Sequence, residues 1–248
     1  MLIMTKADPV ATARELVVER FPQARQAWLA GSVVLGLATE TSDLDIPVLL
    51  DAVEVHRETL RYRGWPVELF VHTEASIHQF LALDLARRRP SLARMISTGV
   101  PLVSGTAGDG VRRECAAVLA AGPGFLDAVG LAYARYTLTD QLDDLAGGAA
   151  PPVRDAIAFD VWRGSAELLL ACAGRWTGTG KWLVREVQAL DEDDGSDYAN
   201  RLHDGLHEAL DGRPDALTVV ADEILQQAGG RLGDGFYLNA PPLQRAES

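Results

Sequence analysis

Asp43 and Asp45 stand two residues apart, at the start of an apolar run that continues to Leu50. Residues i and i+2 of a strand point to the same face of a sheet, so the two carboxylates are expected to lie side by side. Two carboxylates on one face of a buried strand repel each other and are costly to desolvate, so a positive charge must compensate them. Carboxylate oxygens are typical ligands of Mg²⁺, and the pair therefore indicates a divalent-cation site.

A glycine-serine turn precedes the two aspartates. Residues 27–30 form an apolar run that predicts a buried strand, and Gly31 and Ser32 then turn the chain into a predicted short helix. The backbone N–H groups at the start of a helix, together with a serine hydroxyl, are suited to bind an anion. The stretch therefore predicts a phosphate site beside a metal site.

A third carboxylate, Glu68, lies inside another apolar run, residues 66–72, which predicts a further strand. A single glutamate among apolar residues needs a partner for its charge. If the two strands are neighbours in one sheet, Glu68 lies beside Asp43 and Asp45 and completes a cluster of three acids.

The motif residues follow one another in the order Gly31-Ser32, Gly36, Ser42-Asp43-x-Asp45 and then Glu68. This pattern resembles the polymerase-beta-type nucleotidyltransferase superfamily, over about residues 25–72. Within the superfamily, the branch with a helical C-terminal domain, as in aminoglycoside nucleotidyltransferases, is similar in its organisation. Residues 174–182, which include Lys181, also resemble the C-terminal Gly-Lys element of such enzymes.

The resemblance implies transfer of a nucleoside monophosphate from a nucleoside triphosphate, with ATP as the expected donor, to a hydroxyl group. Pyrophosphate is the second product. The implied catalytic residues, which would also hold two Mg²⁺ ions, are Asp43, Asp45 and Glu68. The implied nucleotide-binding residues are Gly31, Ser32 and Lys181.

Two residues depart from what the resemblance leads us to expect. Glu68 stands where aspartate is common in the superfamily, and its longer side chain changes the reach of the third carboxylate. Pro47 follows Asp45 by two residues, inside the predicted strand. Because proline cannot donate to a sheet ladder, the strand is expected to have a gap or an edge at this residue.

The bulk composition limits the classes of function. The chain has 248 residues, of which 48% are hydrophobic, and a formal net charge of −12. This charge argues against a nucleic-acid or membrane partner, since both surfaces are anionic. The N-terminal residues do not have the form of a signal peptide, and Cys115 and Cys172 are expected to be thiols. We therefore predict a cytoplasmic protein.

The order of the predicted elements indicates an α+β protein of two domains. Strands and helices alternate up to about Gly105, and only helices are predicted after it. We predict a nucleotidyltransferase α/β domain with a mixed sheet at residues 1–105, followed by an all-helical bundle at residues 106–248. The helices predicted in the second domain are 109–121, 127–146, 151–173, 181–190, 198–210 and 215–228.

The sequence leaves the acceptor open. The first hypothesis is a hydroxyl of a small molecule, for example an aminoglycoside-like antibiotic. The alternatives are a protein hydroxyl, which would make the chain an AMPylating enzyme, and a non-catalytic module that only binds a nucleotide. The nucleotide base, the general base and the choice between monomer and homodimer are left open as well.

Overall fold

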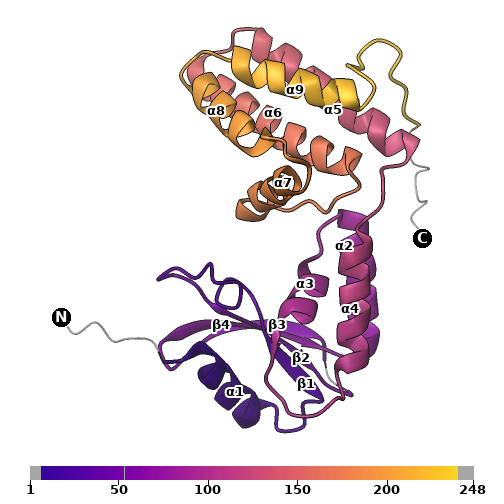
Figure 1. Ribbon diagram of the computed structural model, residues 1–248. Coiled ribbons are helices and arrows are strands. Elements are labelled where there is room, and N and C mark those ends of the chain that lie inside the picture. The colour runs from indigo at the N-terminus through magenta and orange to yellow at the C-terminus, as the bar shows by residue number, and fades with distance from the viewer. Residues whose placement is uncertain (1–6, 53, 240–248) are drawn as a thin grey trace, which may run out of the picture. The chain divides into compact units, whose positions relative to one another are not determined.

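The computed structural model describes residues 7–52 and 54–239, and the chain divides into two compact units, residues 1–122 and 123–248 (Figure 1). The first unit holds a mixed sheet with helices and the second is helical, so the predicted α+β class is confirmed. The border after Gly122 lies beyond the one predicted after residue 105, because α4 (Asp109–Ala121) packs Val111 and Cys115 against α3 (Ser91–Thr98).

A five-stranded sheet forms the centre of the first unit, with the strand order β3-β4-β2-β1-β5. The β2 and β4 strands are parallel, and the other neighbouring pairs are antiparallel. Residues 44–49 and 67–72, which are far apart in the sequence, are thereby brought onto adjacent strands. The strands are β1 (Gln26–Leu29), β2 (Leu44–Leu49), β3 (His56–Tyr62), β4 (Trp65–His72) and β5 (Val100–Pro101).

Pro47 lies in the interior strand β2 and leaves a gap in one of its two ladders. The carbonyls of Asp45 and Leu49 accept hydrogen bonds from Ala30 and Arg25 at 2.8 and 2.9 Å, so these residues present their backbone to the β1 side. Pro47 lies two residues from each of them along the strand, so its nitrogen, which carries no hydrogen, faces the same side. The β1–β2 ladder is accordingly interrupted opposite Pro47, whereas the β2–β4 ladder runs through it.

Helices cover both faces of the sheet (Figure 1). On one face, α1 (Pro9–Arg20) packs Leu16 and Val17 against alternate residues of β2 and β4. On the other face, α2 (Glu74–Arg87), α3 and α4 pack against Trp28 and Leu49. Because side chains alternate along a strand, Asp45 points to the same face as Leu49, away from α1.

The buried carboxylate of Asp84 joins α2 to α3. Its Oδ2 accepts hydrogen bonds from the backbone N–H groups of Leu92 and Ala93, at 2.8 and 3.2 Å. Pro90, the residue immediately before α3, makes no side-chain cap of its own. Asp84 therefore provides the cap for buried N–H groups of the first turn of α3.

We expect Asp84→Ala to lower the free energy of unfolding by about 2 kcal/mol, because two N–H groups in the first turn of α3 lose their acceptor. Urea denaturation followed by circular dichroism measures this loss. Asp84→Asn keeps one acceptor oxygen and is expected to lose less. Equal stability of Asp84→Ala and the wild type would contradict the capping role.

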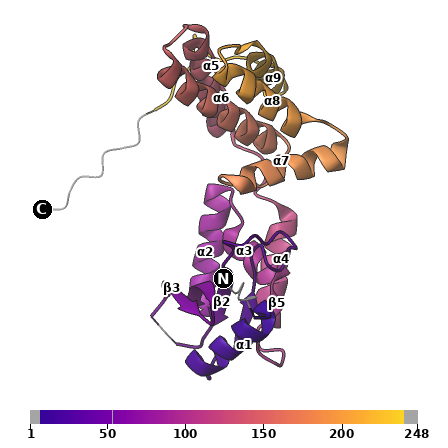
Figure 2. The ribbon, with the colours of Figure 1, turned by 90° about the vertical axis from the view of Figure 1, so that its left-hand side faces the viewer.

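The second unit is a bundle in which every regular element between residues 123 and 239 is a helix. Within it, α6 contacts α5, α7, α8 and α9 (Figure 2). Its core is aliphatic and includes Leu138, Leu170 and Ile224. The helices are α5 (Ala128–Ala146), α6 (Pro151–Cys172), α7 (Lys181–Asp194), α8 (Tyr198–Leu210) and α9 (Asp215–Gln227).

Both cysteines are free thiols, as the sequence predicted. Cys115 lies in the core of the first unit, where burial raises the pKa of its thiol to about 12. None of the described helices is long and apolar enough to cross a membrane.

Candidate active site

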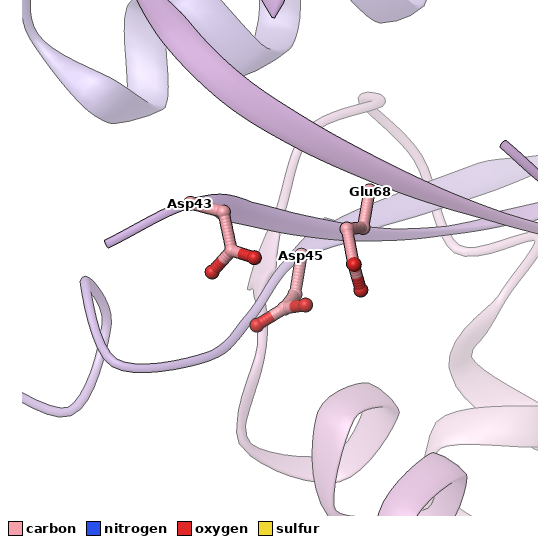
Figure 3. Close-up of side chains that lie close together, drawn as sticks. All are labelled: Asp43, Asp45 and Glu68. Atoms are coloured by element: carbon pink, nitrogen blue, oxygen red, sulfur yellow. The ribbon is translucent and has the colours of Figure 1, made fainter. Parts of the chain in front are cut away.

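The three predicted acids come together on two adjacent strands (Figure 3). Asp43 immediately precedes β2, Asp45 lies in β2, and Glu68 is the register partner of Asp45 in the parallel strand β4. One carboxylate oxygen from each residue lies within 4.8 Å of the other two. All three side chains are partly exposed and point to the same side of the strands, so a cation from solvent could reach them.

The turn at Gly31 lies directly against the carboxylate of Asp45. Gly31 has a positive φ of +78°, and a Cβ atom built on it would stand 2.1 Å from Oδ2 of Asp45. A backbone hydrogen bond of the preceding residue joins the same two segments, since the N–H of Ala30 donates to the carbonyl of Asp45. Glycine is therefore required here both for its backbone conformation and for the close approach of the acid.

The short helix predicted after Ser32 is wrong, because the chain forms only a turn. The N–H groups of Val34 and Leu35 both donate to the carbonyl of Gly31, at 3.2 and 3.3 Å. Gly36 then takes a positive φ of +70°, which lies outside the helical region and ends the turn. The chain after Gly31 thus forms a tight turn and not a helix.

Ser32 is buried and ties the turn to the strand that carries the acids. Its hydroxyl donates to Oγ of Ser42 at 2.9 Å, and the same Oγ accepts the N–H of Thr39 at 2.8 Å. Ser42 directly precedes Asp43, so this network helps to fix the start of the acidic segment. The sequence predicted a phosphate-binding role for Ser32, and that role stays a prediction.

Arg57 is the residue of the site that the sequence did not single out. It lies on β3, and its Nη2 donates to Oε2 of Glu68 at 2.5 Å. Its guanidinium carbon lies 5.0 Å from the ring centroid of Phe70. The signal was the two-residue turn at Arg63 and Gly64, since counting back from it pairs Arg57 with Phe70 and places it diagonally from Glu68.

His72 ends β4 and is buried beneath the helices of its face. Its Nδ1 lies 3.0 Å from Oγ of Ser76, and its ring meets the edge of Phe80 with the ring centroids 4.9 Å apart. Burial lowers the pKa of His72 to about 4. The imidazole is therefore neutral at pH 7, and it serves the packing of β4 against α2.

The pKa of His72 has a consequence for stability at low pH. In the unfolded chain its pKa is about 6.5, above the folded value of about 4, so the unfolded state binds the proton first as the pH falls. The contribution of the neutral His72 to the free energy of unfolding is complete above pH 6.5 and declines towards pH 4, by about 3 kcal/mol in all. Urea denaturation across this pH window should show that the free energy of unfolding of His72→Gln falls by about 3 kcal/mol less than that of the wild type. Parallel pH curves for the two proteins would contradict the burial of a neutral imidazole.

Lys181 belongs to the second unit, where it is the first residue of α7 and is exposed. One helical turn further, the guanidinium of Arg185 lies over the ring of Trp182, with its carbon 4.9 Å from the ring centroid. The nucleotide-binding role of Lys181 stays a prediction.

Of the comparisons with known proteins, the match to a family model lies within the first unit. Residues 10–89 match the family model of the nucleotidyltransferase domain. No sequence among the curated proteins matches the chain. Among solved structures, the chain is similar to a nucleotidyltransferase-like protein from Exiguobacterium sibiricum 255-15, with 13% sequence identity and a TM-score of 0.44. That match covers 90% of this chain and 77% of the other, and at this score it adds nothing to the argument.

All three acids and the Gly31 turn lie inside the matched residues. The match confirms the resemblance to nucleotidyltransferases, while the aminoglycoside branch stays a prediction. The domain that holds the acidic cluster, residues 10–89, is a nucleotidyltransferase domain, and the chain is a transferase.

Proposed function

We propose that this protein is a metal-dependent nucleotidyltransferase that transfers a nucleoside monophosphate to a hydroxyl group of a small molecule. ATP is the proposed donor and pyrophosphate the second product. The observation that carries the proposal is the cluster of Asp43, Asp45 and Glu68, with ligand oxygens within 4.8 Å of one another in a nucleotidyltransferase domain.

The three carboxylates fit a site for Mg²⁺. They offer hard oxygen ligands, they are partly exposed, and their like charges are stabilised by a cation between them. When bound, divalent ions in such a site neutralise the charge of the triphosphate and lower the pKa of the attacking hydroxyl. Asp43, Asp45 and Glu68 are the residues that would hold them.

The chain's own groups position the reactants. In the proposed reaction the acceptor hydroxyl loses its proton to water and its oxygen bonds to the α-phosphorus. The bond from that phosphorus to the oxygen that bridges it to the β-phosphorus breaks, and pyrophosphate leaves with that oxygen. The tight turn at Gly31 lies directly against the carboxylate of Asp45, so phosphate oxygens bound at this turn would lie beside the cations. Ser32 is the proposed further ligand of the triphosphate. Positioning of this kind supplies most of the acceleration in phosphoryl chemistry.

The proposed acceptor is a small, positively charged molecule with hydroxyl groups, such as an aminoglycoside. The support for it is the formal net charge of −12, which attracts cations and repels the phosphate backbone of nucleic acids. The charge supports the class of acceptor and does not select one compound.

The test uses the full chain with Mg²⁺ and ATP labelled at the α-phosphate, incubated with aminoglycosides or with a cell lysate. We expect the label to appear on a small molecule. This labelling should be lost when EDTA is added and in the double variant Asp43→Asn/Asp45→Asn. Label found only on protein would overturn the small-molecule acceptor in favour of protein AMPylation. Binding of ATP without transfer to any acceptor would indicate a non-catalytic module.

A further inference from the structure

Arg57 approaches the acidic cluster from the edge strand of the sheet. In the β3–β4 ladder, Thr59 is the register partner of Glu68, and Arg57 is the partner of Phe70. Register partners share a face of the sheet, so Arg57 lies diagonally from Glu68 on the face that holds the acids. Its guanidinium crosses the ring of Phe70 to reach Oε2 of Glu68.

The contact occupies one oxygen of Glu68 and leaves the carboxylate able to offer the other. The side chain of Glu68 is 22% exposed and that of Arg57 is 62% exposed, so the ion pair is set at the edge of the site and not inside it. The guanidinium is fixed by two contacts of different kinds, the ring of Phe70 and the carboxylate, which restricts the rotation of both charged groups.

We propose that Arg57 is a positioning residue that holds Glu68 to a single-oxygen contact with the cation and thereby selects Mg²⁺ over Ca²⁺. This inference rests on the proposed function, since it takes the acidic cluster as the cation site. Mg²⁺ requires a near-octahedral set of ligands with short bonds. Ca²⁺ takes six to eight oxygens and readily binds both oxygens of one carboxylate. A glutamate that has given one oxygen to Arg57 suits the first ion better than the second.

Arg61 supplies a matched control on the same strand. It stands two residues after Thr59, as Arg57 stands two residues before it, so both arginines are diagonal to Glu68. Arg61 is exposed and, in the part of the chain that the structure describes, makes no hydrogen bond or ion pair with Glu68. Arg57→Gln and Arg61→Gln therefore remove the same charge from the same strand, and only the first releases Oε2.

The experiment measures cation binding to the full chain without any reaction. Mn²⁺ bound to the protein is followed by electron paramagnetic resonance, and Mg²⁺ and Ca²⁺ are titrated as competitors to obtain their dissociation constants. In Arg57→Gln, we expect the preference for Mg²⁺ over Ca²⁺ to fall by about tenfold, because Glu68 gains a second free oxygen. In Arg61→Gln, both ions should shift by the same factor, of about twofold or less, since only a screened charge is lost.

The ratio of the two constants separates positioning from simple charge removal. If Arg57→Gln tightens Mg²⁺ and Ca²⁺ by an equal factor, or leaves both unchanged, the selectivity role of Arg57 is overturned while the metal site stands. If the wild type and Asp45→Asn bind Mn²⁺ equally weakly, the metal site of the proposed function fails instead. Circular dichroism and thermal melting of each variant establish that it is folded before its affinities are compared.

Discussion

Replacement of Asp45 by asparagine is expected to lower kcat/KM for nucleotidyl transfer by about 10³-fold or more, with the protein still folded. Asp45 lies between the other two acids, with Asp43 before it on the chain and Glu68 opposite it on β4. Its amide isostere removes one negative charge from the centre of the cluster. The loss corresponds to about 4 kcal/mol of transition-state stabilisation, the size expected when a metal ligand is lost.

Asp51→Asn is the control for Asp45→Asn. Asp51 follows the end of β2, its side chain is 80% exposed, and its ion pair with Arg25 has a distance of 3.4 Å. The same chemical change there should leave kcat/KM within about twofold, because an exposed ion pair contributes little. The affinity for Mn²⁺ should fall in Asp45→Asn and not in Asp51→Asn. Full activity of Asp45→Asn with unchanged Mn²⁺ affinity would remove Asp45 from the site.

Gly31→Ala is expected to reduce kcat/KM by about 10²-fold, because its added methyl group would lie 2.1 Å from Oδ2 of Asp45. The carboxylate must move away, or the turn must, and a displacement of about 1 Å is enough for a loss of this size. The positive φ of +78° adds a cost of about 1 kcal/mol to folding for any residue with a Cβ atom. Steady-state kinetics and urea denaturation measure the two effects separately.

Gly36→Ala separates backbone strain from the clash. Gly36 has a similar φ of +70°, and a Cβ atom on it would meet nothing within 4 Å. This variant should lose about 1 kcal/mol of stability and keep its activity within about threefold. If Gly31→Ala and Gly36→Ala lose activity to the same degree, strain in the turn is the cause and contact with Asp45 is not.

The sequence was sufficient to predict that the three acids lie together, because their placement depends on a simple rule of strand geometry. Alternation along β2 put Asp43 and Asp45 on one face, and the only further assumption was that the strand of Glu68 lies beside it. The parallel β2–β4 pairing makes Glu68 the direct partner of Asp45. The strand and helix pattern was readable for the same reason, since apolar periodicity and the Gly and Pro residues between elements are local signals.

The features that were missed depend on contacts between distant segments. The pairing of Arg57 with Glu68 requires the register of a hairpin, and the hydrogen bond from Ser32 to Ser42 requires the path of a loop. The border of the first unit depends on α4, which has the helical pattern of the second unit and packs with the first. A pattern along the chain identifies an element without identifying the surface that buries it.

The gap at Pro47 gives the two halves of the site different mechanical support. The β2–β4 ladder that carries Asp45 and Glu68 is continuous, whereas beyond the gap the Gly31 turn is held by the bridge between Ala30 and Asp45 and by the hydrogen bond from Ser32 to Ser42. Loss of these contacts would loosen the turn, while the β2–β4 ladder would keep Asp45 opposite Glu68. The part of the site suited to phosphate can therefore open on its own, at a small fraction of the free energy of global unfolding, while the part suited to the cation stays assembled.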